Sequence, residues 1–458
     1  MGISKFNFKN FKATLNGMRV CLLKRYIGPF KRRRMWLERT QWYSASELKE
    51  LQLELLKRIV LHAYETVPYY NRLMQELRLY PGDIKNLDDI RKFPIMCKED
   101  LKRAGDDIVS AKFNKMFLRT AHTGGTTGLP VPIKRDLWSI GNEHAFVRRQ
   151  FDWAGVGMSN RCAYLEGRTV AAPGTNNGQM YMYDAVMKEL TLSTFHLSLE
   201  KVPSYIEAMK AYGTDVLAGY PSALYVMAKG CLKCGISMPL RCALTTSEML
   251  DDGKREVISR VFDCGVFDFY GSAERVCYIH TCEQGSYHII PEYGLTELHP
   301  AGPPNEDCFR IVATGFWNMA MPLIRYDIGD LVQTSGEKCR CGREFPVVKR
   351  IFGRDGNLIV TPSGRILGAS VIECILARVL YGMYDMPVVA GRVIQEADNL
   401  VVLEYVPADR FSGRHAKEIE DILREKVPPE LKIEIRSVKQ IRRTAGGKFV
   451  SFVMAEHH

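Results

Sequence analysis

A loop of small and hydroxyl-bearing residues is the stretch of the sequence best suited to hold an anion. Glycines let backbone N–H groups turn towards a bound anion, and threonine hydroxyls add donors. The spacing is not that of a Walker A loop, and no Lys-Ser or Lys-Thr pair follows the last glycine. The loop therefore predicts a triphosphate site, with an ordinary turn as the alternative. Its residues are Thr123, Gly124, Gly125, Thr126, Thr127, Gly128, Leu129 and Pro130.

Three cysteines and one histidine form a second candidate site. Cys282 and His288 are separated by five residues, and Cys339 and Cys341 flank a single arginine on a tight turn. Four such ligands complete a tetrahedral zinc site with no open position, which favours a structural metal. The spacing is not that of a standard zinc finger, so unligated thiols are the alternative. Residues less well placed, or able to substitute for His288, are Cys277, Cys308 and His280.

The bulk composition is ordinary for a globular protein with a sizeable core. The 458 residues are 46% hydrophobic and 25% charged, and this length predicts several domain-sized units or one large domain with a smaller partner. No run approaches the roughly 18 apolar residues of a spanning helix, and we expect a cytoplasmic protein. The odd number of cysteines, 13, argues against a disulfide framework.

The net charge of +11 lies almost entirely in a basic leader, residues 1–40. This segment holds eleven of the 63 basic residues and one of the 52 acidic residues, so the rest of the chain is nearly neutral. Apolar residues alternate with the bases, and such a segment can lie on an anionic membrane surface at the inner face of the membrane. The alternative is a helix whose apolar face packs on the body. Nucleic acid is a poorer partner, because no recognition motif accompanies the charge.

The elements that must position these residues follow from local patterns. Serines before Glu47 predict a helix start, and apolar residues from Leu51 to Leu61 recur with helical spacing. Pro68 predicts the end of that helix. Three later segments, 215–222, 242–248 and 266–274, are buried strands that break into polar turns. Since strands alternate with helices, we expect a largely parallel α/β core with a ligand site beyond the carboxyl ends of these strands.

Several separated motifs together resemble the phenylacetate–CoA ligase and CapK-like branch of the adenylate-forming enzymes. They occur in the family's order and cover about residues 36–453. The resemblance implies a large α/β N-terminal domain with mixed and parallel sheets, and a small, mobile α+β C-terminal domain. With the basic leader at 1–40, the resemblance places the large domain at 41–352 and the small domain at 353–458. The motifs are Val67-Pro68-Tyr69-Tyr70, Phe93-Pro94-Ile95, Lys98-Glu99-Asp100-Leu101 and the loop at 123–130.

The resemblance assigns most of the ATP site. The pentapeptide Tyr270, Gly271, Ser272, Ala273 and Glu274 matches the pattern in which the aromatic ring flanks adenine and the glutamate holds Mg²⁺. A hard oxygen ligand suits that ion. By the same resemblance, Ser247 and Glu248 belong to the adenine pocket.

Three further residues follow in family order. Asp330 would accept hydrogen bonds from both ribose hydroxyls, Arg354 would contact the ribose or the α-phosphate, and Lys448 would be the catalytic lysine of the small domain. A positive charge there would offset charge as pyrophosphate leaves. The hinge residue is Asp355 or Asn357. Leu129 stands where many relatives have lysine, so Mg²⁺, Lys134 or Arg135 would have to steady the phosphates.

The function implied is ATP-dependent activation of a carboxylic acid as an acyl-adenylate, followed by transfer to the thiol of CoA or of a carrier protein. The alternative is an adenylyltransferase or amide-forming enzyme of surface-polysaccharide or natural-product biosynthesis, without a thioester product. A membrane-associated binding protein without activity is disfavoured by the presence of both Asp330 and Lys448. Aromatic residues that could line the acid pocket, or belong to the core, are Trp138, Phe146, Tyr164, Tyr181 and Tyr220.

Overall fold

The computed structural model describes most of the chain, and side chains at 353–354, 359–360, 366–367, 422, 425–426 and 452–454 are outside the description. The described residues are 29–122, 131–167, 170, 180–184, 187, 189–301, 308–334, 336–354, 359–360, 362, 366–367, 387–397, 399–427, 429–441 and 452–454. Within them, no helix is long and apolar enough to cross a membrane.

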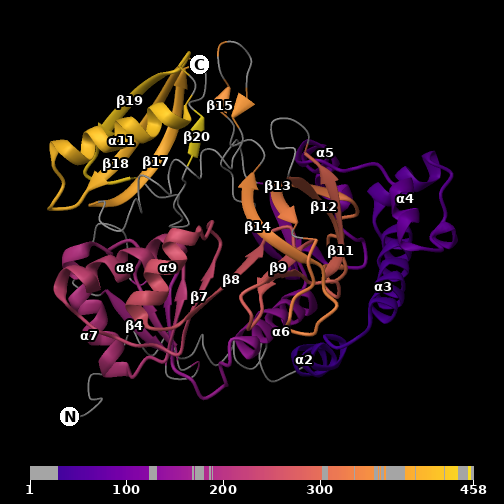
Figure 1. The fold of residues 1–458 in the computed structure, drawn as a ribbon. Coiled ribbons are helices and arrows are strands. Elements are labelled where there is room, and N and C mark those ends of the chain that lie inside the picture. Colours follow the sequence, from indigo (N-terminus) through magenta and orange to yellow (C-terminus); the bar gives the residue numbers. More distant parts are fainter. Residues whose placement is uncertain are drawn as a thin grey trace.

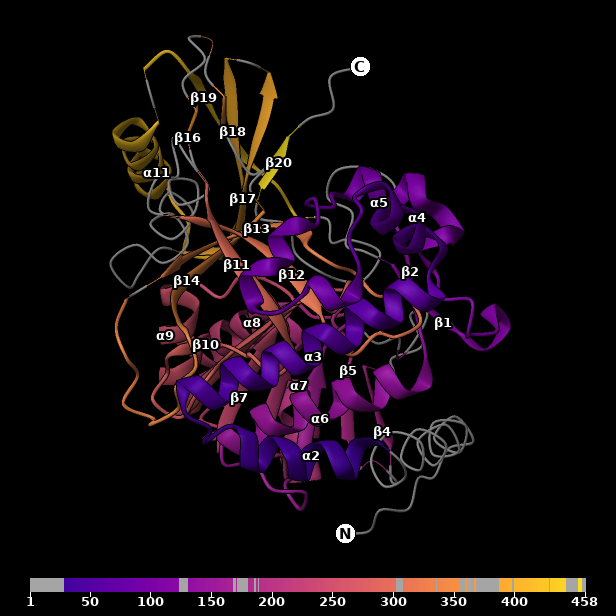
Figure 2. The same ribbon diagram turned by 90° about the vertical axis from the view of Figure 1, so that its right-hand side faces the viewer.

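The first described elements are helices that pack along one side of the molecule (Figure 2). The Ser44 side chain and Glu47 form a capping box, which confirms the predicted helix start, and Val67 ends that helix before Pro68 as predicted. The following helix starts at Pro68, where a missing N–H costs nothing. These helices are α2 (Pro29–Thr40), α3 (Ala45–Thr66), α4 (Pro68–Glu76) and α5 (Lys98–Ala104), with 3₁₀ turns η2 (Pro81–Asp83), η3 (Leu87–Lys92), η4 (Gly105–Ile108) and η5 (Lys115–Phe117).

Helix α2, at the end of the basic leader, is docked on the body. Arg33 lies over the Trp317 ring at 3.5 Å and donates from Nε to Asn142 at 3.0 Å. Arg34 pairs with Asp152 of α6 at 3.3 Å. Two of the leader's arginines therefore hold α2 against the large domain; residues 1–28 lie outside the described residues.

One sheet of twelve strands forms the centre of the molecule (Figure 1), in the order β11-β12-β13-β14-β10-β9-β8-β7-β6-β3-β5-β4. The half of the sheet that comes first in the sequence is parallel from β5 through β3, β6 and β7 to β8, and β4 pairs antiparallel with β5 at its edge. The strands of this half are β3 (Cys162–Leu165), β4 (Tyr181–Asp184), β5 (Glu189–Leu192), β6 (Val216–Gly219), β7 (Cys242–Thr246) and β8 (Gly265–Gly271). This confirms the predicted parallel α/β core.

Helices cover both faces of the parallel half. One face packs through residues such as Leu217 and Ala243 against α7, α8 and α9, while the other packs through Val216 and Leu244 against α6. The strands are buried on both faces, which explains their nearly continuous apolar sequences. The helices are α6 (Leu137–Trp153), α7 (Val202–Tyr212), α8 (Pro221–Cys234) and α9 (Asp252–Phe262), and the short turn η6 is Leu199–Lys201.

The other half of the sheet is antiparallel, which agrees with the mixed sheet that the resemblance implies, although local patterns did not locate its strands. Strand β14 pairs with both β13 and β10, so the chain returns into the sheet rather than adding to its edge. The strands are β9 (Tyr278–Thr281), β10 (Tyr287–Ile289), β11 (Gly294–Pro300), β12 (Phe309–Gly315), β13 (Tyr326–Thr334) and β14 (Val347–Arg354).

A four-stranded sheet with one helix forms the C-terminal unit, in the order β19-β18-β17-β20. It lies above α8 and α9 in Figure 1, and Asp409 pairs there with Lys233 of α8. Its elements are β17 (Val388–Ala397), β18 (Leu400–Pro407), α11 (Gly413–Lys426), β19 (Lys432–Ser437) and β20 (Phe452–Met454). This unit has the α+β composition that the resemblance implies. Two small pairs complete the structure: β1 (Arg119–His122) with β2 (Pro132–Arg135), and β15 (Ile359–Val360) with β16 (Ile366–Leu367).

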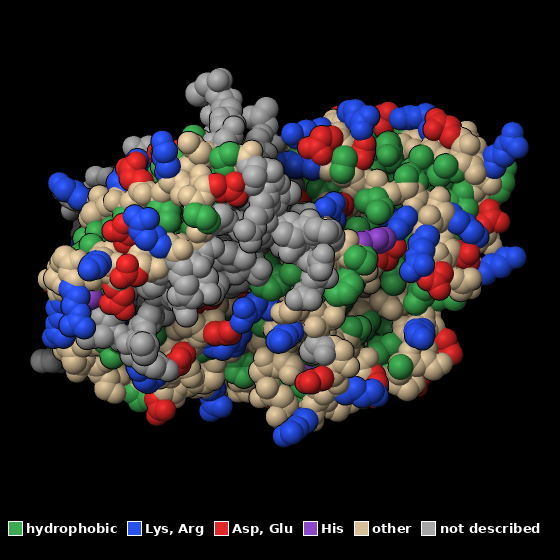
Figure 3. Space-filling model, turned by 45° about the horizontal axis from the view of Figure 1, so that its top comes forward, with side chains coloured by type: hydrophobic (Ala, Val, Ile, Leu, Met, Phe, Trp, Pro, Cys, Tyr) green, Lys and Arg blue, Asp and Glu red, His purple; other side chains and the backbone are tan. Residues whose placement is uncertain are grey.

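Charged side chains of both signs are interspersed over the face shown in Figure 3. This agrees with the nearly neutral composition of the chain beyond residue 40.

Candidate active site and metal cluster

Polar segments meet at the carboxyl ends of β6, β7 and β8, as predicted. The three strands are neighbours, with Gly219 opposite Thr245 and Thr246 opposite Phe269. Tyr220, Ser247 and the turn from Tyr270 to Glu274 therefore leave the sheet at one edge. In a parallel sheet this is the edge where ligands bind.

Tyr270 and Asp330 contact each other directly. The Tyr270 hydroxyl donates to Asp330 Oδ2 at 2.5 Å, although the two residues are 60 positions apart in the chain. Burial and the neighbouring Asp330 carboxylate raise the pKa of Tyr270 well above its ordinary value, so the phenol stays a donor. Two residues assigned separately to adenine and ribose are thus held together before any nucleotide binds.

Glu274 lies in a tight turn after β8. It is 6% exposed, and its Oε1 accepts from the Tyr326 hydroxyl at 3.4 Å. The hydroxyl of Ser272, in the same turn, is buried without a hydrogen-bond partner among the described residues. A buried, unpartnered hydroxyl is uncommon and marks a place where a ligand or ion can be accommodated.

Two glycines let the chain pass close behind this turn. A Cβ at Gly315 would lie 2.7 Å from the Arg275 carbonyl oxygen, and one at Gly294 would lie 2.2 Å from that of Val276. The two glycines are paired across β11 and β12. The antiparallel half of the sheet therefore supports the turn through contacts that only glycine allows.

Ser247 and Glu248 follow β7. Ser247 has φ +69°, an uncommon conformation for a residue other than glycine. Glu248 Oε2 accepts from the backbone N–H of Ser222 at 3.1 Å, within the first turn of α8. The carboxylate thus satisfies one of the unpaired donors at that helix start.

Several predicted site residues cannot be compared with the geometry. The loop residues Thr123 to Gly128, Lys448 and the hinge candidates Asp355 and Asn357 lie outside the described residues. The backbone of Arg354 ends β14 directly opposite Asp330, while its side chain is outside the description. The roles assigned to all of these remain proposals.

Two cavities lie away from the predicted ATP residues. A cavity of about 350 Å³ lies between α2 and the end of α6, lined by Arg34, Arg149 and Trp153 among others. A smaller one of about 170 Å³ lies between α4 and the segment around Phe93. Neither is lined by the residues assigned to ATP.

The aromatic residues considered for the acid pocket fall into two groups. Phe146 is fully buried in the main core, and Tyr164 and Tyr220 are 8% and 7% exposed among core residues. Trp138 is 64% exposed and Tyr181 46%.

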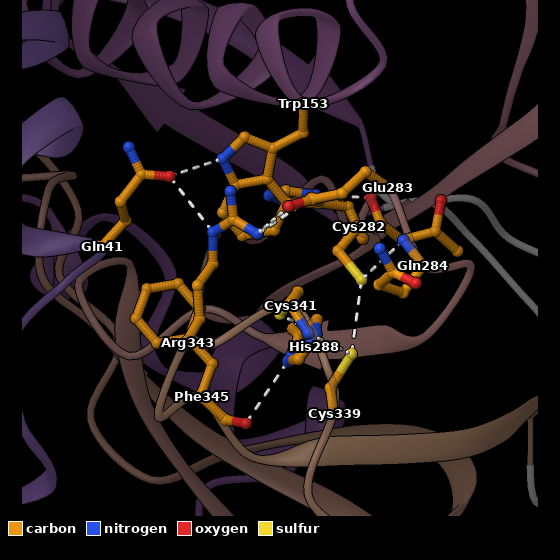
Figure 4. A network of polar contacts seen from close by, with 12 residues as sticks. Gln41, Trp153, Cys282, Glu283, Gln284, His288, Cys339, Cys341, Arg343 and Phe345 are labelled. Atoms are coloured by element: carbon orange, nitrogen blue, oxygen red, sulfur yellow. Dashed lines mark hydrogen bonds and ion pairs between the residues drawn. The ribbon is translucent and has the colours of Figure 1, made fainter.

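The four metal candidates converge, although two come from the β9–β10 hairpin and two from the chain before β14 (Figure 4). Their ligand atoms all lie within 4.8 Å of one another. The sulfurs of Cys282 and Cys339 are 3.6 Å apart, and Cys341 Sγ is 3.4 Å from His288 Nε2. Thiolates about 2.3 Å from a tetrahedral zinc would be about 3.7 Å apart. The donor set and its spacing therefore fit zinc.

Neighbouring groups orient these ligands. His288 Nδ1 lies 3.3 Å from the Phe345 carbonyl oxygen, which turns Nε2 towards the sulfurs. Burial raises the pKa of Cys282 to about 12, so this sulfur keeps its proton unless a cation replaces it.

The other candidate ligands lie elsewhere. His280 lies opposite His288 across the hairpin and packs on Trp153, with ring centroids 4.3 Å apart. Cys277 accepts from Thr296 Oγ1 at 3.5 Å, and Cys308 packs with Leu331 and Phe352.

An arginine links this cluster to the N-terminal helices. Arg343 donates to Glu283 at 2.9 Å and to Gln41 at 3.1 Å, and its guanidinium lies 3.7 Å from the centroid of the Trp153 ring. Gln41 also accepts from the Trp153 indole at 2.8 Å. The turn that carries Cys339 and Cys341 is thus fastened to α6 and to the end of α2.

Sequence analysis assigned no role to Arg275 or Glu143, which lie beside the turn from Tyr270 to Glu274. Arg275 directly follows Glu274 and has φ +57°. Its Nε lies 3.7 Å from Oε2 of Glu143, in α6. For Arg275, the available sequence signal was its position next to Glu274. For Glu143 there was no such signal, because only the fold brings it close to Arg275.

Known proteins of similar sequence and fold span nearly the whole chain. No family model matches it. It is 22% identical to protein CapK of Staphylococcus aureus, over 96% of this chain and 95% of CapK. It is 25% identical to the phenylacetate–coenzyme A ligase of Thermus thermophilus, over 88% of this chain and 95% of that enzyme. A crystal structure of 2-hydroxyisobutyryl-CoA ligase in the postadenylation state is similar in fold, with TM-score 0.69, 18% identity and 94% of each chain covered.

Proposed function

We infer that the chain belongs to the adenylate-forming enzymes, in the branch of the phenylacetate–CoA ligases and CapK. On this premise we propose that it activates a carboxylic acid with ATP. A carboxylate oxygen of the acid attacks the α-phosphorus, and the bond from that phosphorus to the bridging oxygen breaks. Pyrophosphate leaves with the electron pair, and an acyl-adenylate remains. The thiolate of CoA then attacks the acyl carbon and AMP leaves, giving a thioester.

The contact between Tyr270 and Asp330 is the observation that best supports this proposal. The Asp330 carboxylate has oxygens enough to keep the Tyr270 hydrogen bond, 2.5 Å long, and to accept from ribose hydroxyls. The Tyr270 ring would then flank the base while its hydroxyl orients the ribose acceptor. Such preorganised positioning is the main contribution a protein makes to phosphoryl chemistry.

The remaining groups would act on the phosphates. Glu274 is a buried carboxylate of the type that holds Mg²⁺, and the ion, when bound, would neutralise charge on the leaving pyrophosphate. The loop from Thr123 to Gly128 would donate to the same phosphates. Lys448 would bring a positive charge to the acid carboxylate and α-phosphate.

Pyrophosphate exchange tests the first step. Purified chain with MgATP and labelled pyrophosphate should form labelled ATP when a panel of aryl, fatty and amino acids contains a substrate. Absence of exchange with every acid, in protein shown to bind ATP, would contradict the proposal.

The mass of the product, with and without CoA, tests the second step. A thioester that appears only with CoA supports thiol transfer. An adenylylated or amide product formed without CoA would instead support the alternative enzyme of surface-polysaccharide or natural-product biosynthesis.

For the cysteine and histidine cluster we propose a structural zinc ion. The donor set is complete without water, and an adjacent carbonyl orients His288, both of which are typical of structural sites. Metal analysis of protein purified without chelator should give about one zinc per chain. Metal-free, fully folded protein would contradict the proposal.

For the basic leader we propose contact with an anionic membrane surface. Lys31, Arg32 and Arg39 are exposed on α2, and nearby Met35 and Trp42 are 62% and 57% exposed. Basic residues interspersed with apolar ones favour the interface of an anionic bilayer. Vesicles with phosphatidylserine should bind the full chain and neutral vesicles should not; equal binding to both would contradict the proposal.

A further inference from the structure

Two arginines lie on either side of the turn that carries Glu274. Arg135 ends β2, and its Nη2 donates to the carbonyl oxygen of Ala273. Arg275 follows Glu274 directly. Both side chains therefore belong to the surroundings of residues 273–275, and burial, followed by the charge of Arg275, lowers the pKa of Arg135 to about 10. Like charges are not brought together in a partly buried site without compensation.

The compensation among the described residues is incomplete. Glu143 Oε2 lies 3.7 Å from Arg275 Nε, but the same oxygen accepts from the Tyr293 hydroxyl at 2.5 Å. Glu274 is the other carboxylate that acts on Arg135, and the proposed function assigns it to Mg²⁺. With that ion bound, two guanidinium groups would share Glu143 alone.

Three donor groups here lack hydrogen-bond partners within the described part of the chain. They are Nε of Arg135, Nη1 of Arg275 and the hydroxyl of Ser272, all buried. Leaving such atoms unpaired is costly, and native proteins usually pair them with protein, water, an ion or a ligand. An oxyanion such as a phosphate or carboxylate has acceptor oxygens for donors of this kind.

The surrounding structure holds the donors in place. Close packing of Gly294 and Gly315 behind Arg275 and Val276 fixes the turn from the sheet side, and the bond from Arg135 to Ala273 fixes it from β2. Arginine presents a planar set of donors that matches carboxylate and phosphate oxygens. A rigid set of this kind loses little entropy when it binds an anion.

We propose that Arg135, Arg275 and Ser272 bind an oxyanion of one of the reactants, either the pyrophosphate portion of ATP or a second carboxylate of the acid substrate. The inference rests on the proposed function and narrows it. If the anion is pyrophosphate, the two arginines take the role of the lysine that many relatives have at the position of Leu129. If it is a carboxylate, the substrate is a dicarboxylic acid.

Calorimetric titration of the full-length chain with inorganic pyrophosphate, and separately with succinate, tests the site without requiring turnover. Arg275→Met should weaken one of these two by about tenfold to a hundredfold, since it removes charge-assisted hydrogen bonds. Arg72→Met is the matched control, because Arg72 forms an exposed pair with Asp107 and should leave both affinities unchanged. Unchanged affinity for both probes in Arg275→Met, or no binding of either by the wild type, would overturn the proposal.

A second variant keeps the test decisive if Arg275→Met fails to fold. Glu143→Gln removes the carboxylate next to Arg275 and should bind the same probe more tightly by several-fold; unchanged or weaker binding would overturn the proposal. The exchange assay distinguishes the two ligands. In Arg275→Met, a rise in KM for ATP alone assigns the site to pyrophosphate, and a rise in KM for the acid alone assigns it to a second carboxylate. Failure of the wild type to exchange with any acid would contradict the proposed function, whatever the titrations give.

Discussion

The two polar clusters of the large domain lie at the two ends of one strand, β9, and they are built in opposite ways. The turn from Tyr270 to Glu274 precedes the strand, and Cys282 follows it. Seven residues, 275–281, separate Glu274 from Cys282, and four of them form β9. In the metal cluster, the ligand atoms lie within 4.8 Å of each other. At the other end, the Ser272 hydroxyl and atoms of two arginines have no partner among the described residues.

This difference distinguishes a site for a permanent ion from a site for a reactant. Metal ligands that converge, as in the metal cluster, can hold a permanent ion that stabilises the fold. Hydrogen-bond donors without a protein partner lower the stability of the free protein, and this stability is regained when a reactant binds. We call the cluster around Ser272, Arg135 and Arg275 the open cluster. We therefore expect substitutions in the open cluster to reduce turnover without unfolding the protein. Substitutions in the metal cluster should instead lower stability and leave the turnover of the folded protein unchanged.

The largest effect on turnover is expected for Lys448→Ala. Removing one charge aimed at the transition state costs about a hundredfold to a thousandfold in rate, so pyrophosphate exchange should nearly vanish while ATP binding and the melting temperature stay close to wild type. The matched control is Lys439→Ala, an exposed lysine of the same C-terminal unit. Wild-type exchange rates in Lys448→Ala would remove this residue from the mechanism.

The largest effect on stability is expected for Cys339→Ser combined with Cys341→Ser. Loss of a metal belongs to the few changes that cost roughly 3 kcal/mol or more in the free energy of unfolding. Zinc content, measured by metal analysis, should fall to near zero, and chemical denaturation should show the loss. The folded fraction should still exchange pyrophosphate at low temperature.

Cys234→Ser is the control for the metal cluster, because Cys234 is an exposed thiol at the end of α8. It should leave zinc content and stability unchanged. If the double variant kept its zinc, or lost exchange while keeping its stability, the contrast between the two clusters would be wrong.

The sequence predicted the elements with strong local signals. The Ser44 cap, the helix end before Pro68 and the three parallel strands that end in polar turns were all confirmed. The convergence of Cys282, His288, Cys339 and Cys341 was predicted from residue types together with the resemblance. Two pairs of such residues on short turns need only one long-range contact to meet. Tyr270 and Asp330 were assigned by resemblance, and their direct contact was not foreseen.

The antiparallel half of the sheet could not be predicted in the same way. The return of β14 between β13 and β10 depends on pairings between distant strands, which leave little trace in local periodicity. For the same reason the contact of Glu143 with Arg275, and the packing of Gly294 and Gly315 behind the turn, were missed. These long-range contacts determine which charged side chains lie beside the turn from Tyr270 to Glu274.

Gly315→Ala should test whether the antiparallel half supports the open cluster. A Cβ at this position would lie 2.7 Å from the Arg275 carbonyl oxygen, so the turn must shift, at a cost of about 1–3 kcal/mol in stability. Exchange activity should fall by about tenfold, because small displacements of positioned groups are costly. Gly82→Ala, with open space around the added Cβ, should change neither quantity; equal behaviour of the two variants would show that the turn does not depend on this packing.

The smallest effect is expected for Tyr270→Phe, which keeps the aromatic ring and removes the hydrogen bond to Asp330. A hydrogen bond to a charged group contributes about 1.5–3 kcal/mol, but ribose or water can replace part of it, so KM for ATP should rise by roughly tenfold with little change in kcat. If the hydroxyl orients Asp330 for ribose, the variant should also discriminate less between ATP and its 2′-deoxy and 3′-deoxy analogues. Tyr80→Phe, at a tyrosine that is 61% exposed, is the control. Unaltered KM and unaltered discrimination in Tyr270→Phe would mean that the contact with Asp330 only stabilises the turn. The Tyr270 hydroxyl would then have no part in nucleotide binding.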